Sequence, residues 1–398
     1  MKVLTFSTLF PNSKQPNHAV FVKHRMSAVR SFFDVDLRVV APVPYFPKLP
    51  FNFIDKWKMF AGIPGKENCD GIKVYHPRYV IIPKMGMMLH GYCMFLGSLR
   101  QVLKIQKEFP FDLIDAHFIY PDGVAAILLG KMLRKPVVLS ARGTDINLYP
   151  EFKTIRPLIR WALGNAKHVI AVCESLKDLM VNLGINDNRI SSIPNGIDPD
   201  IFSPMDKLDA RRKLGLKLDE KILISVGALI ERKGMHILID ALVEIKRKGC
   251  LTFNTYIIGK GEQGERLQES INFHGLQGNV KLCGEVKNSD LPQWYNAADI
   301  SFLGSSREGW PNVVSESLAC GAPVIATAVN GTPEILRSEE YGILVNRDAQ
   351  AFEKGIMSGF SKTWDRKKII NYGQSRPWSV VAKEVHSVFK SVLEDGTH

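Results

Sequence analysis

The stretch ISFLGSSREGWPNVVSESLACGAPVIAT, residues 300–327, decides the fold class. The apolar runs ISFL and VIAT at its two ends predict buried strands. Between them, Pro311 is a residue favoured at the first position of a helix, and Gly321 is favoured just after the last turn, so we predict a helix near 311–320. A strand, a helix and a second strand in this order form the βαβ unit of a parallel sheet.

The same alternation continues in both directions along the chain. A helix is expected at 235–248, where apolar residues recur at helical spacing. Further strands are expected at 3–7, 36–40, 113–116, 137–140, 169–172, 222–226, 254–258 and 280–283. Three prolines between 194 and 204 end the first series, so we predict two doubly wound, parallel-sheet α/β domains, 1–197 and 198–376.

Charge separates the two halves of the chain. Of 398 residues, 45% are hydrophobic, which excludes global disorder, and the net charge is +12. Residues 1–197 hold 26 Lys and Arg against 14 Asp and Glu, whereas 198–398 hold 26 of each. An excess in one half indicates an anionic partner, such as a membrane surface or a phosphate-bearing substrate. A basic nucleic-acid-binding protein is the alternative from another class, but we find no binding module for nucleic acid and expect none bound.

The cysteines and the apolar segments bear on the compartment. The six cysteines are scattered and form no Cys-x-x-Cys pair, so we expect reduced thiols, no disulfide framework and no zinc. The first ten residues lack the long apolar region of a signal peptide and predict a strand. The longest uncharged stretch, 85–99, is too short to span a bilayer. A cytoplasmic protein is expected.

Two loops after predicted strands carry the candidate chemistry, because doubly wound sheets bind ligands beyond the carboxyl ends of their strands. The loop that starts at Gly227 contains Arg232 and Lys233 directly before a helix, which suits an anion; a solvated basic loop is the alternative. In the other loop, Glu308 is followed by Glu316 one turn into the helix. Their carboxylates could accept hydrogen bonds from sugar and ribose hydroxyls, or they could be ordinary surface glutamates.

Taken together, these motifs resemble the family 4 glycosyltransferases. The resemblance rests on Glu308-x7-Glu316, on the Arg232-Lys233 loop and on the run IPNGID at 193–198. It extends over nearly the whole chain through GKG at 259–261, GTPE at 331–334 and Trp378. The resemblance implies the GT-B fold, in which two Rossmann-like domains face a central cleft. It also implies that the terminal helix, 377–398, packs back on the first domain.

The resemblance implies a role for each residue of the second domain's site. Glu308 would contact the hydroxyls of the donor sugar, and Glu316 those of the ribose. Arg232 and Lys233 would hold the diphosphate and stabilise the leaving group, so that no metal and no cofactor is required. The full donor-binding set is Gly227, Arg232, Lys233, Glu308, Gly309, Trp310, Pro311, Asn312 and Glu316. Ala228 departs from the family, which often has an arginine there.

In the first domain, the resemblance points to His117. It follows a predicted strand and would hydrogen-bond the donor sugar near the reacting carbon, which makes His117, Arg232, Lys233 and Glu308 the predicted catalytic residues. A lone histidine is otherwise more often structural. The candidate cleft or acceptor residues are Asn17, His18, Asp145 and Asn195. Two departures from the family are present: Arg142 stands where relatives have histidine, and the run Asn17-His18-Ala19 stands where glycine is common.

The implied activity is a retaining, metal-independent sugar transfer from a nucleoside diphosphate, UDP being expected, to a glycan or lipid-linked acceptor of cell-surface polysaccharide or glycolipid synthesis. The Met- and aromatic-rich stretch 85–109 either packs on the core or contacts an anionic membrane from the cytoplasmic side. A nucleotide-sugar epimerase or a phosphorylase of the same fold, and a catalytically silent binding subunit, are the alternatives.

Overall fold

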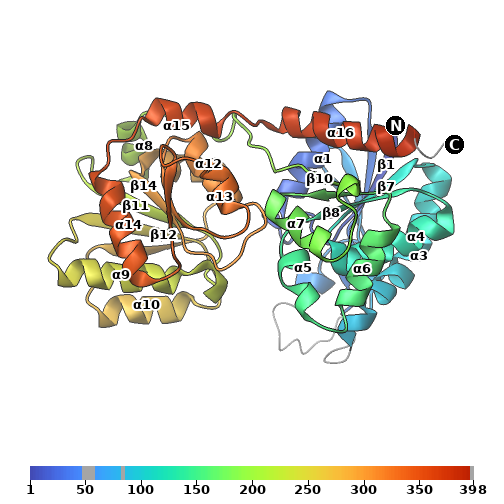
Figure 1. Ribbon diagram of the computed structural model, residues 1–398, viewed down its shortest axis with the longest axis horizontal. Coiled ribbons are helices and arrows are strands. Elements are labelled where there is room, and N and C mark those ends of the chain that lie inside the picture. Colours follow the sequence, from blue (N-terminus) through green and yellow to red (C-terminus); the bar gives the residue numbers. More distant parts are fainter. Residues whose placement is uncertain (47–58, 82–85, 395–398) are drawn as a thin grey trace. The chain divides into compact units, whose positions relative to one another are not determined.

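The structure is a computed structural model that describes residues 1–46, 59–81 and 86–394. Its contacts divide the chain into two compact units (Figure 1). The N-terminal unit consists of Met1–Gly196 together with Trp378–His398, and the C-terminal unit is Ile197–Pro377. Each unit is an α/β layer structure built on one large sheet.

The sheet of the N-terminal unit has the strand order β10-β9-β8-β7-β1-β2-β5-β4. All neighbouring strands are parallel except β4 and β5, which pair antiparallel at the edge. The strands are β1 (Lys2–Phe6), β2 (Asp36–Val40), β4 (Lys66–Cys69), β5 (Ile72–Tyr75), β7 (Leu113–His117), β8 (Val137–Ala141), β9 (His168–Ala171) and β10 (Ile190–Ser192), with a separate short pair β3 (Val43–Pro44) and β6 (Arg78–Tyr79).

The helices of the N-terminal unit come from both ends of the chain. They are α1 (Val20–Phe32), α3 (His90–Glu108), α4 (Val124–Leu133), α5 (Thr144–Asn147), α6 (Arg156–Asn165), α7 (Glu174–Asn182) and α16 (Trp378–Glu394). Helix α16 packs against α1, and its residues Val381, Val385 and Phe389 are buried in the core of this unit. Helix α16 is therefore part of the hydrophobic core of the N-terminal unit.

The sheet of the C-terminal unit is wholly parallel, in the order β13-β12-β11-β14-β15-β16. Its strands are β11 (Lys221–Val226), β12 (Phe253–Ile258), β13 (Val280–Gly284), β14 (Ile300–Leu303), β15 (Val324–Thr327) and β16 (Gly342–Val345). Its helices are α8 (Lys207–Leu214), α9 (Met235–Arg247), α10 (Gly264–Phe273), α11 (Leu291–Ala297), α12 (Asn312–Ala319), α13 (Thr332–Ile335), α14 (Ala349–Ser361) and α15 (Arg366–Gly373).

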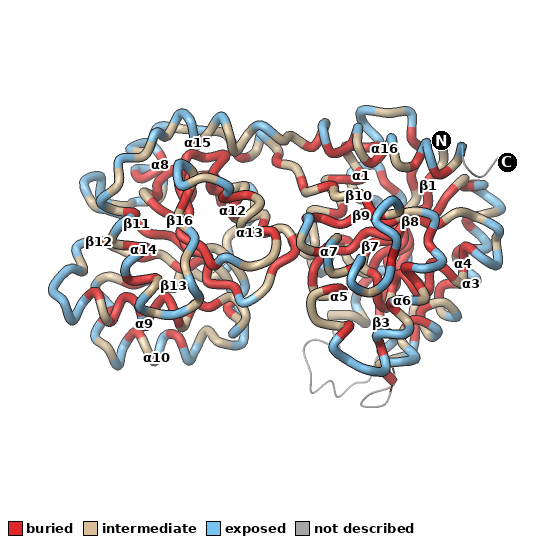
Figure 2. Tube along the Cα trace, viewed as in Figure 1, coloured by how far each residue is buried: buried red, intermediate tan, exposed pale blue. Residues whose placement is uncertain are grey.

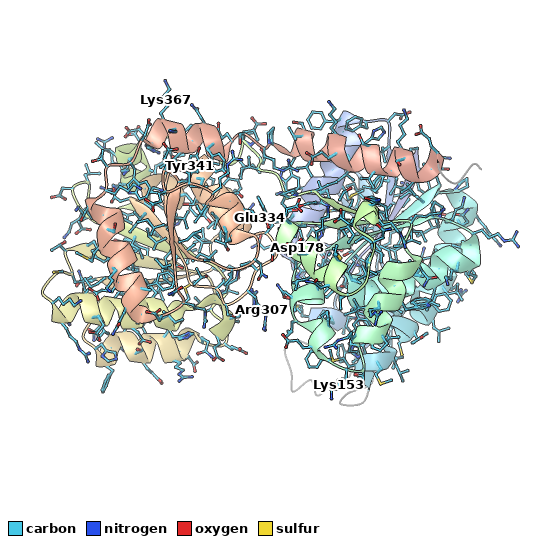
Figure 3. The ribbon with its side chains drawn as sticks, in the orientation of Figure 1. Lys153, Asp178, Arg307, Glu334, Tyr341 and Lys367 are labelled. Carbon is cyan, nitrogen blue, oxygen red and sulfur yellow. The ribbon has the colours of Figure 1, made fainter. Side chains whose placement is uncertain are left out.

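Burial explains why these sequences form these layers. The central strands β11, β14 and β15 are buried along most of their length, whereas the helices around them have both buried and exposed residues (Figure 2). Because all strands of this sheet are parallel, the loops that follow them share one edge, where Arg307 and Glu334 lie (Figure 3). The predicted α/β class with parallel, doubly wound sheets is confirmed.

The βαβ unit predicted from residues 300–327 is present, with one correction at the helix start. Strands β14 and β15 have the predicted bounds, but α12 begins at Asn312 rather than at Pro311. The backbone of Pro311, at φ −75° and ψ 91°, is extended, so this residue caps the helix instead of belonging to it. Within the described residues, no helix combines the length and the apolar character needed to cross a membrane.

Candidate functional site

Two loops of the C-terminal unit lie against each other at the carboxyl edge of its sheet. Strand β14 pairs directly with β11, so the loops that follow them are neighbours. The N–H of Ser306 donates to the carbonyl oxygen of Arg232 at 2.9 Å, and Arg232 Nη1 donates to the carbonyl oxygen of Arg307 at 2.8 Å. A Cβ atom on Gly234, whose φ is +71°, would lie 2.1 Å from the carbonyl oxygen of Gly304, so only glycine permits this approach.

This contact places Glu308 among cations and a hydroxyl group. Lys233 Nζ donates to Glu308 Oε1 at 2.5 Å, Ser305 Oγ donates to the same oxygen at 2.6 Å, and Arg232 Nη1 is 3.7 Å from it. Glu308 is only 9% exposed. Burial alone would raise its pKa, but the charge and hydrogen bond of Lys233, with Ser305 and Arg232, hold the pKa below the ordinary value. Glu308 is therefore an ionised carboxylate near neutral pH.

The rest of the predicted donor set continues along the same edge. The N–H of Glu308 donates to Asn330 Oδ1 at 3.1 Å, which ties this loop to the one after β15. Gly309 is buried, Trp310 is half-buried, and the Trp310 indole Nε1 has no hydrogen-bond partner among the described residues. Gly227 directly follows β11, and its N–H donates to the carbonyl oxygen of Ile258. The structure thus gathers the predicted loop residues at one edge.

Glu316 lies on α12 and has a partner that its sequence motif does not contain. Tyr295 on α11 donates its hydroxyl to Glu316 Oε2 at 3.1 Å. Burial raises the pKa of Glu316 to about 7, although the hydrogen bond from Tyr295 acts in the opposite direction. Near neutral pH this carboxyl group therefore exchanges between its protonated and ionised forms.

In the N-terminal unit, His117 is fully buried at the end of β7. Its Nε2 contacts Asp115 Oδ2 at 2.8 Å, and its Nδ1 accepts a hydrogen bond from Arg142 Nη2. Burial lowers the pKa of His117 to about 4; Arg142 acts in the same direction and Asp115 against it. The imidazole is therefore neutral, with Nε2–H donating to Asp115, and both ring nitrogens are engaged within the protein.

Arg142 also connects His117 to Asn195. Arg142 Nη1 donates to Asn195 Oδ1 at 3.1 Å, and the buried Arg25 on α1 approaches the same oxygen at 3.4 Å. Arg25 Nη2 also donates to the carbonyl oxygen of Ile193 at 2.9 Å. Arg142, at the position where the family resemblance implies a histidine, therefore joins two of the predicted residues, His117 and Asn195.

The other candidates of this unit have separate surroundings. Asp145 is buried, and its carboxylate accepts the backbone N–H groups of Ile119, Arg142 and Gly143 at 2.8 to 3.2 Å, which stabilises the turn after β8. Burial raises the pKa of Asp145 despite these bonds. His18 Nε2 contacts the carbonyl oxygen of Thr8 at 3.2 Å, and Asn17 is exposed.

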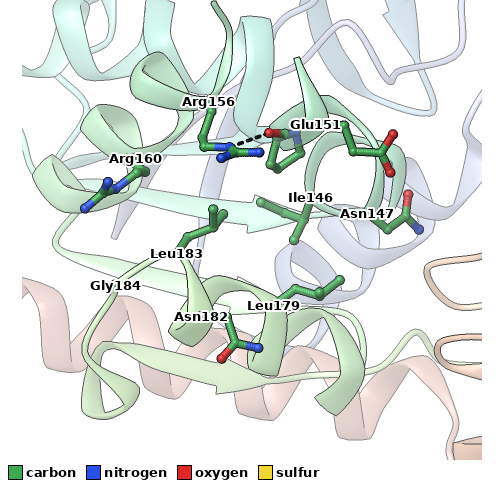
Figure 4. Close-up of a pocket in the computed structure, with 10 residues that line it drawn as sticks. Ile146, Asn147, Glu151, Arg156, Arg160, Leu179, Asn182, Leu183 and Gly184 are labelled. Carbon is green, nitrogen blue, oxygen red and sulfur yellow. Dashed lines mark hydrogen bonds between the residues drawn. The ribbon is translucent and has the colours of Figure 1, made fainter. Parts of the chain in front are cut away.

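A cavity of about 430 Å³ lies in the N-terminal unit, among helices α5, α6 and α7 and the turn after α5 (Figure 4). It is lined by Ile146, Asn147, Pro150, Glu151, Arg156, Arg160, Leu179, Asn182, Leu183 and Gly184. Arg156 Nε donates to the carbonyl oxygen of Pro150 at 2.6 Å across its rim (Figure 4). None of the predicted site residues lines this cavity. Within the described part of the chain, no three His, Cys, Asp or Glu side chains are grouped as metal ligands would be.

The sequence and the structure are similar to those of known proteins. Residues 33–201 match the family profile described as Glycosyltransferase Family 4, and residues 206–376 match Glycosyl transferases group 1. The chain is 29% identical over 360 residues to the putative teichuronic acid biosynthesis glycosyltransferase TuaC of Bacillus subtilis, covering 89% of this chain and 88% of the relative.

Solved structures match over the whole chain. A sucrose-phosphate synthase from Thermosynechococcus elongatus superimposes with a TM-score of 0.78 at 18% identity, covering 99% of both chains. Anabaena Alr3699/HepE, solved in complex with UDP, superimposes with a TM-score of 0.71 at 22% identity over 98% of this chain and 100% of its own. These likenesses show that the fold is GT-B, as predicted.

Proposed function

Because this chain belongs to glycosyltransferase family 4, we propose that it transfers a sugar from a nucleoside-diphosphate donor to a glycan or lipid-linked acceptor, with retention and without a metal. The observation that carries the proposal is the group formed by Lys233, Arg232 and Glu308, in which two cations and an ionised carboxylate share one edge of a doubly wound sheet. Ligands of such sheets bind beyond this edge.

The charges in this group suit the two ends of such a donor. Arg232 and Lys233 would neutralise the diphosphate, and Glu308 would accept hydrogen bonds from the sugar hydroxyls. On α12, Glu316 would accept from the ribose hydroxyls, with Tyr295 holding its other oxygen. Gly227 and the backbone of 309–312 would complete the donor site, including Trp310, Pro311 and Asn312.

The proposed reaction proceeds on one face of the sugar. The bond between C1 and the phosphate oxygen breaks while the acceptor hydroxyl attacks C1 from the same side. Its proton passes to the leaving diphosphate. Arg232 and Lys233 stabilise the negative charge that develops there, which a divalent metal does in other transferases. His117 would contact the donor sugar only after its bond to Arg142 or to Asp115 has opened.

UDP is the nucleotide we propose, and polysaccharide assembly is the proposed setting. Two of the similar solved structures are Alr3699/HepE with UDP and with UDP-glucose, and the similar TuaC carries teichuronic acid biosynthesis in its name. An epimerase or phosphorylase would use the same cations, so the acceptor requirement separates them from a transferase.

Nucleotide binding tests the proposed function. We expect UDP to bind more tightly than GDP or ADP, equally with and without Mg²⁺, in calorimetric titrations. Glu316→Ala should weaken binding, because the ribose hydroxyls lose their acceptor. The matched control is Glu340→Ala, which removes an exposed glutamate that pairs with Lys368 in the same unit. If the wild-type protein bound none of the three nucleotides, the proposed function would be wrong.

We also propose that the acceptor side contacts an anionic membrane surface through α3. Leu96, which is 66% exposed, lies one turn from Tyr92 on the exposed side of this helix, and the exposed Arg100 and Lys104 follow it. An apolar stripe bordered by cations suits a helix lying in a lipid headgroup layer. Such a contact would give a role to part of the positive charge of the first half. The predicted stretch began at residue 85, which lies outside the described residues, as do 47–58.

Vesicle binding tests this surface. The protein should sediment with vesicles containing anionic lipid, and less so as salt increases. Leu96→Gln should weaken the association. Phe273→Gln is the control, because Phe273 is 85% exposed in the C-terminal unit and should be silent. Equal binding by wild type and Leu96→Gln would remove this helix from the proposal.

A further inference from the structure

Arg347, a residue outside the predicted donor set, bridges the two loops of that site. It lies two residues beyond β16, at the edge of the sheet, with β15 between β16 and β14. Its Nε donates to the carbonyl oxygen of Gly304 at 2.9 Å, and its Nη2 donates to that of Glu231 at 3.2 Å. Gly304 begins the loop that carries Glu308, and Glu231 directly precedes Arg232 and Lys233, so one guanidinium binds both loops.

The two loops need such a connection because their side chains must stay at a fixed separation. The loops are linked by the bond from the Ser306 N–H to the Arg232 carbonyl, by the bond from the Arg232 guanidinium to the Arg307 carbonyl, and by the ion pair of Lys233 with Glu308. A planar guanidinium with five N–H groups can donate to two carbonyl oxygens in fixed directions, which a lysine ammonium does less well. The chemistry of the side chain therefore fits the geometry of the contact.

The backbone next to Arg347 is anchored by contacts that do not involve the two loops. The next residue, Asp348, caps α14 by accepting the N–H of Ala351 at 2.8 Å. The side chain of Arg347 is half-buried and extends from this anchored point to the two carbonyl groups. Shortening the side chain should therefore release the loops without disturbing the fold.

We propose that Arg347 is a positioning residue for the donor site: it holds the loop of Lys233 against the loop of Glu308, so that the cation for the diphosphate and the carboxylate for the sugar keep their mutual placement. The inference rests on the proposed function and extends it to a residue that touches neither part of the donor.

Hydrogen exchange of the full-length protein without nucleotide tests the contact by itself. In Arg347→Ala, we expect peptides covering 227–235 and 303–309 to exchange faster, while β12 and α14 keep their protection. Arg247→Ala is the control, since it removes an exposed arginine paired with Glu244. Unchanged exchange in both loops, or faster exchange throughout the unit, would overturn the proposal.

Kinetics and chemical rescue test the role in the reaction. Arg347→Ala should lower turnover about 10- to 100-fold and weaken UDP binding. Added methylguanidinium should restore part of the loss in Arg347→Ala and none in Lys233→Ala. Wild-type affinity and turnover in Arg347→Ala would overturn the proposal. If the wild-type protein itself bound no nucleotide, the donor function would fail instead, and the exchange experiment would still decide the loop contact.

Discussion

Nζ of Lys233 lies 2.5 Å from Oε1 of Glu308, so the cation and the carboxylate of the donor site neutralise each other. The pair lies at the junction of two loops and is largely buried. A diphosphate that binds Lys233 must therefore share it with Glu308. This competition sets the expected behaviour of substitutions at both positions.

Glu308→Gln should separate binding from turnover. Without its charged partner, Lys233 can direct its full charge to the diphosphate, so UDP affinity should stay equal or become a few-fold tighter. Transfer should fall about 100-fold, because the sugar hydroxyls lose an ionised acceptor. Calorimetry of UDP and a transfer or donor-hydrolysis assay measure the two effects. A parallel loss of UDP affinity would show that Glu308 does not compete for Lys233.

Removing Lys233 should destabilise the protein, because the buried carboxylate of Glu308 then loses its nearest cation. For Lys233→Met we expect the free energy of unfolding of the C-terminal unit to fall by about 3 kcal/mol. The double variant Lys233→Met with Glu308→Gln should recover most of the loss, since no uncompensated charge remains. Denaturant unfolding of the three proteins checks this. An equally unstable double variant would mean that packing, not charge, explains the effect.

The dependence of UDP binding on pH should follow Glu316. The pKa of this group is raised to about 7, so its carboxylate form, which accepts two hydroxyl hydrogen bonds, is populated above that pH and lost below it. UDP affinity should therefore weaken as the pH falls from about 8 to about 6. In Glu316→Gln, the pH dependence of UDP affinity should arise only from the titration of the nucleotide's own phosphate. Identical pH profiles for the two proteins would contradict the assignment.

The sequence could predict what depends on hydrophobic spacing and strand order. The runs at 300–303 and 324–327 are wholly apolar or nearly so, and their strands have the predicted bounds. Lys233 and Glu308 could be expected together, because each follows a strand and parallel strands end at one edge. By contrast, β4 escaped prediction: KENC contains no apolar run, and only the Asp70-Gly71 turn, with φ +50° and +80°, signals a hairpin.

The contacts in the site that the sequence did not predict join residues that share no local sequence pattern. Tyr295 contacts Glu316 from the preceding helix, and Arg347 contacts the loops from a position two residues beyond the edge strand β16. Arg142 reaches His117 from 25 residues away, and it changes a histidine expected to face a ligand into one whose two nitrogens are occupied. Such contacts depend on side-chain reach across the sheet, which spacing along the chain does not encode.

The protein should become more stable when Ala19 is changed to glycine. Its φ of +49° and ψ of +41° are left-handed, a conformation that costs a non-glycine residue about 1 to 2 kcal/mol. Glycine also increases the entropy of the unfolded chain, which lowers stability by about 0.5 to 1 kcal/mol. Because the relief of backbone strain is larger, Ala19→Gly should raise the free energy of unfolding by about 0.5 kcal/mol. Ala28→Gly, in the interior of α1, should instead lose about 1 kcal/mol. Denaturant unfolding measures the change in stability of both variants. A lower stability of Ala19→Gly would contradict the argument from the left-handed backbone.

Shortening Phe389 should destabilise the N-terminal unit although the residue lies only nine positions before the end of the sequence. Its side chain is fully buried against α1, so Phe389→Ala should lower the free energy of unfolding of that unit by about 3 kcal/mol or more. Hydrogen exchange measures the stability of the two units separately. In Phe389→Ala, the amides of β1 and β7 should lose protection, whereas those of β11 and β14 should keep theirs. Lys390→Ala is the control, because that side chain is exposed. If the loss appeared in β11 and β14 instead, α16 would belong to the other core.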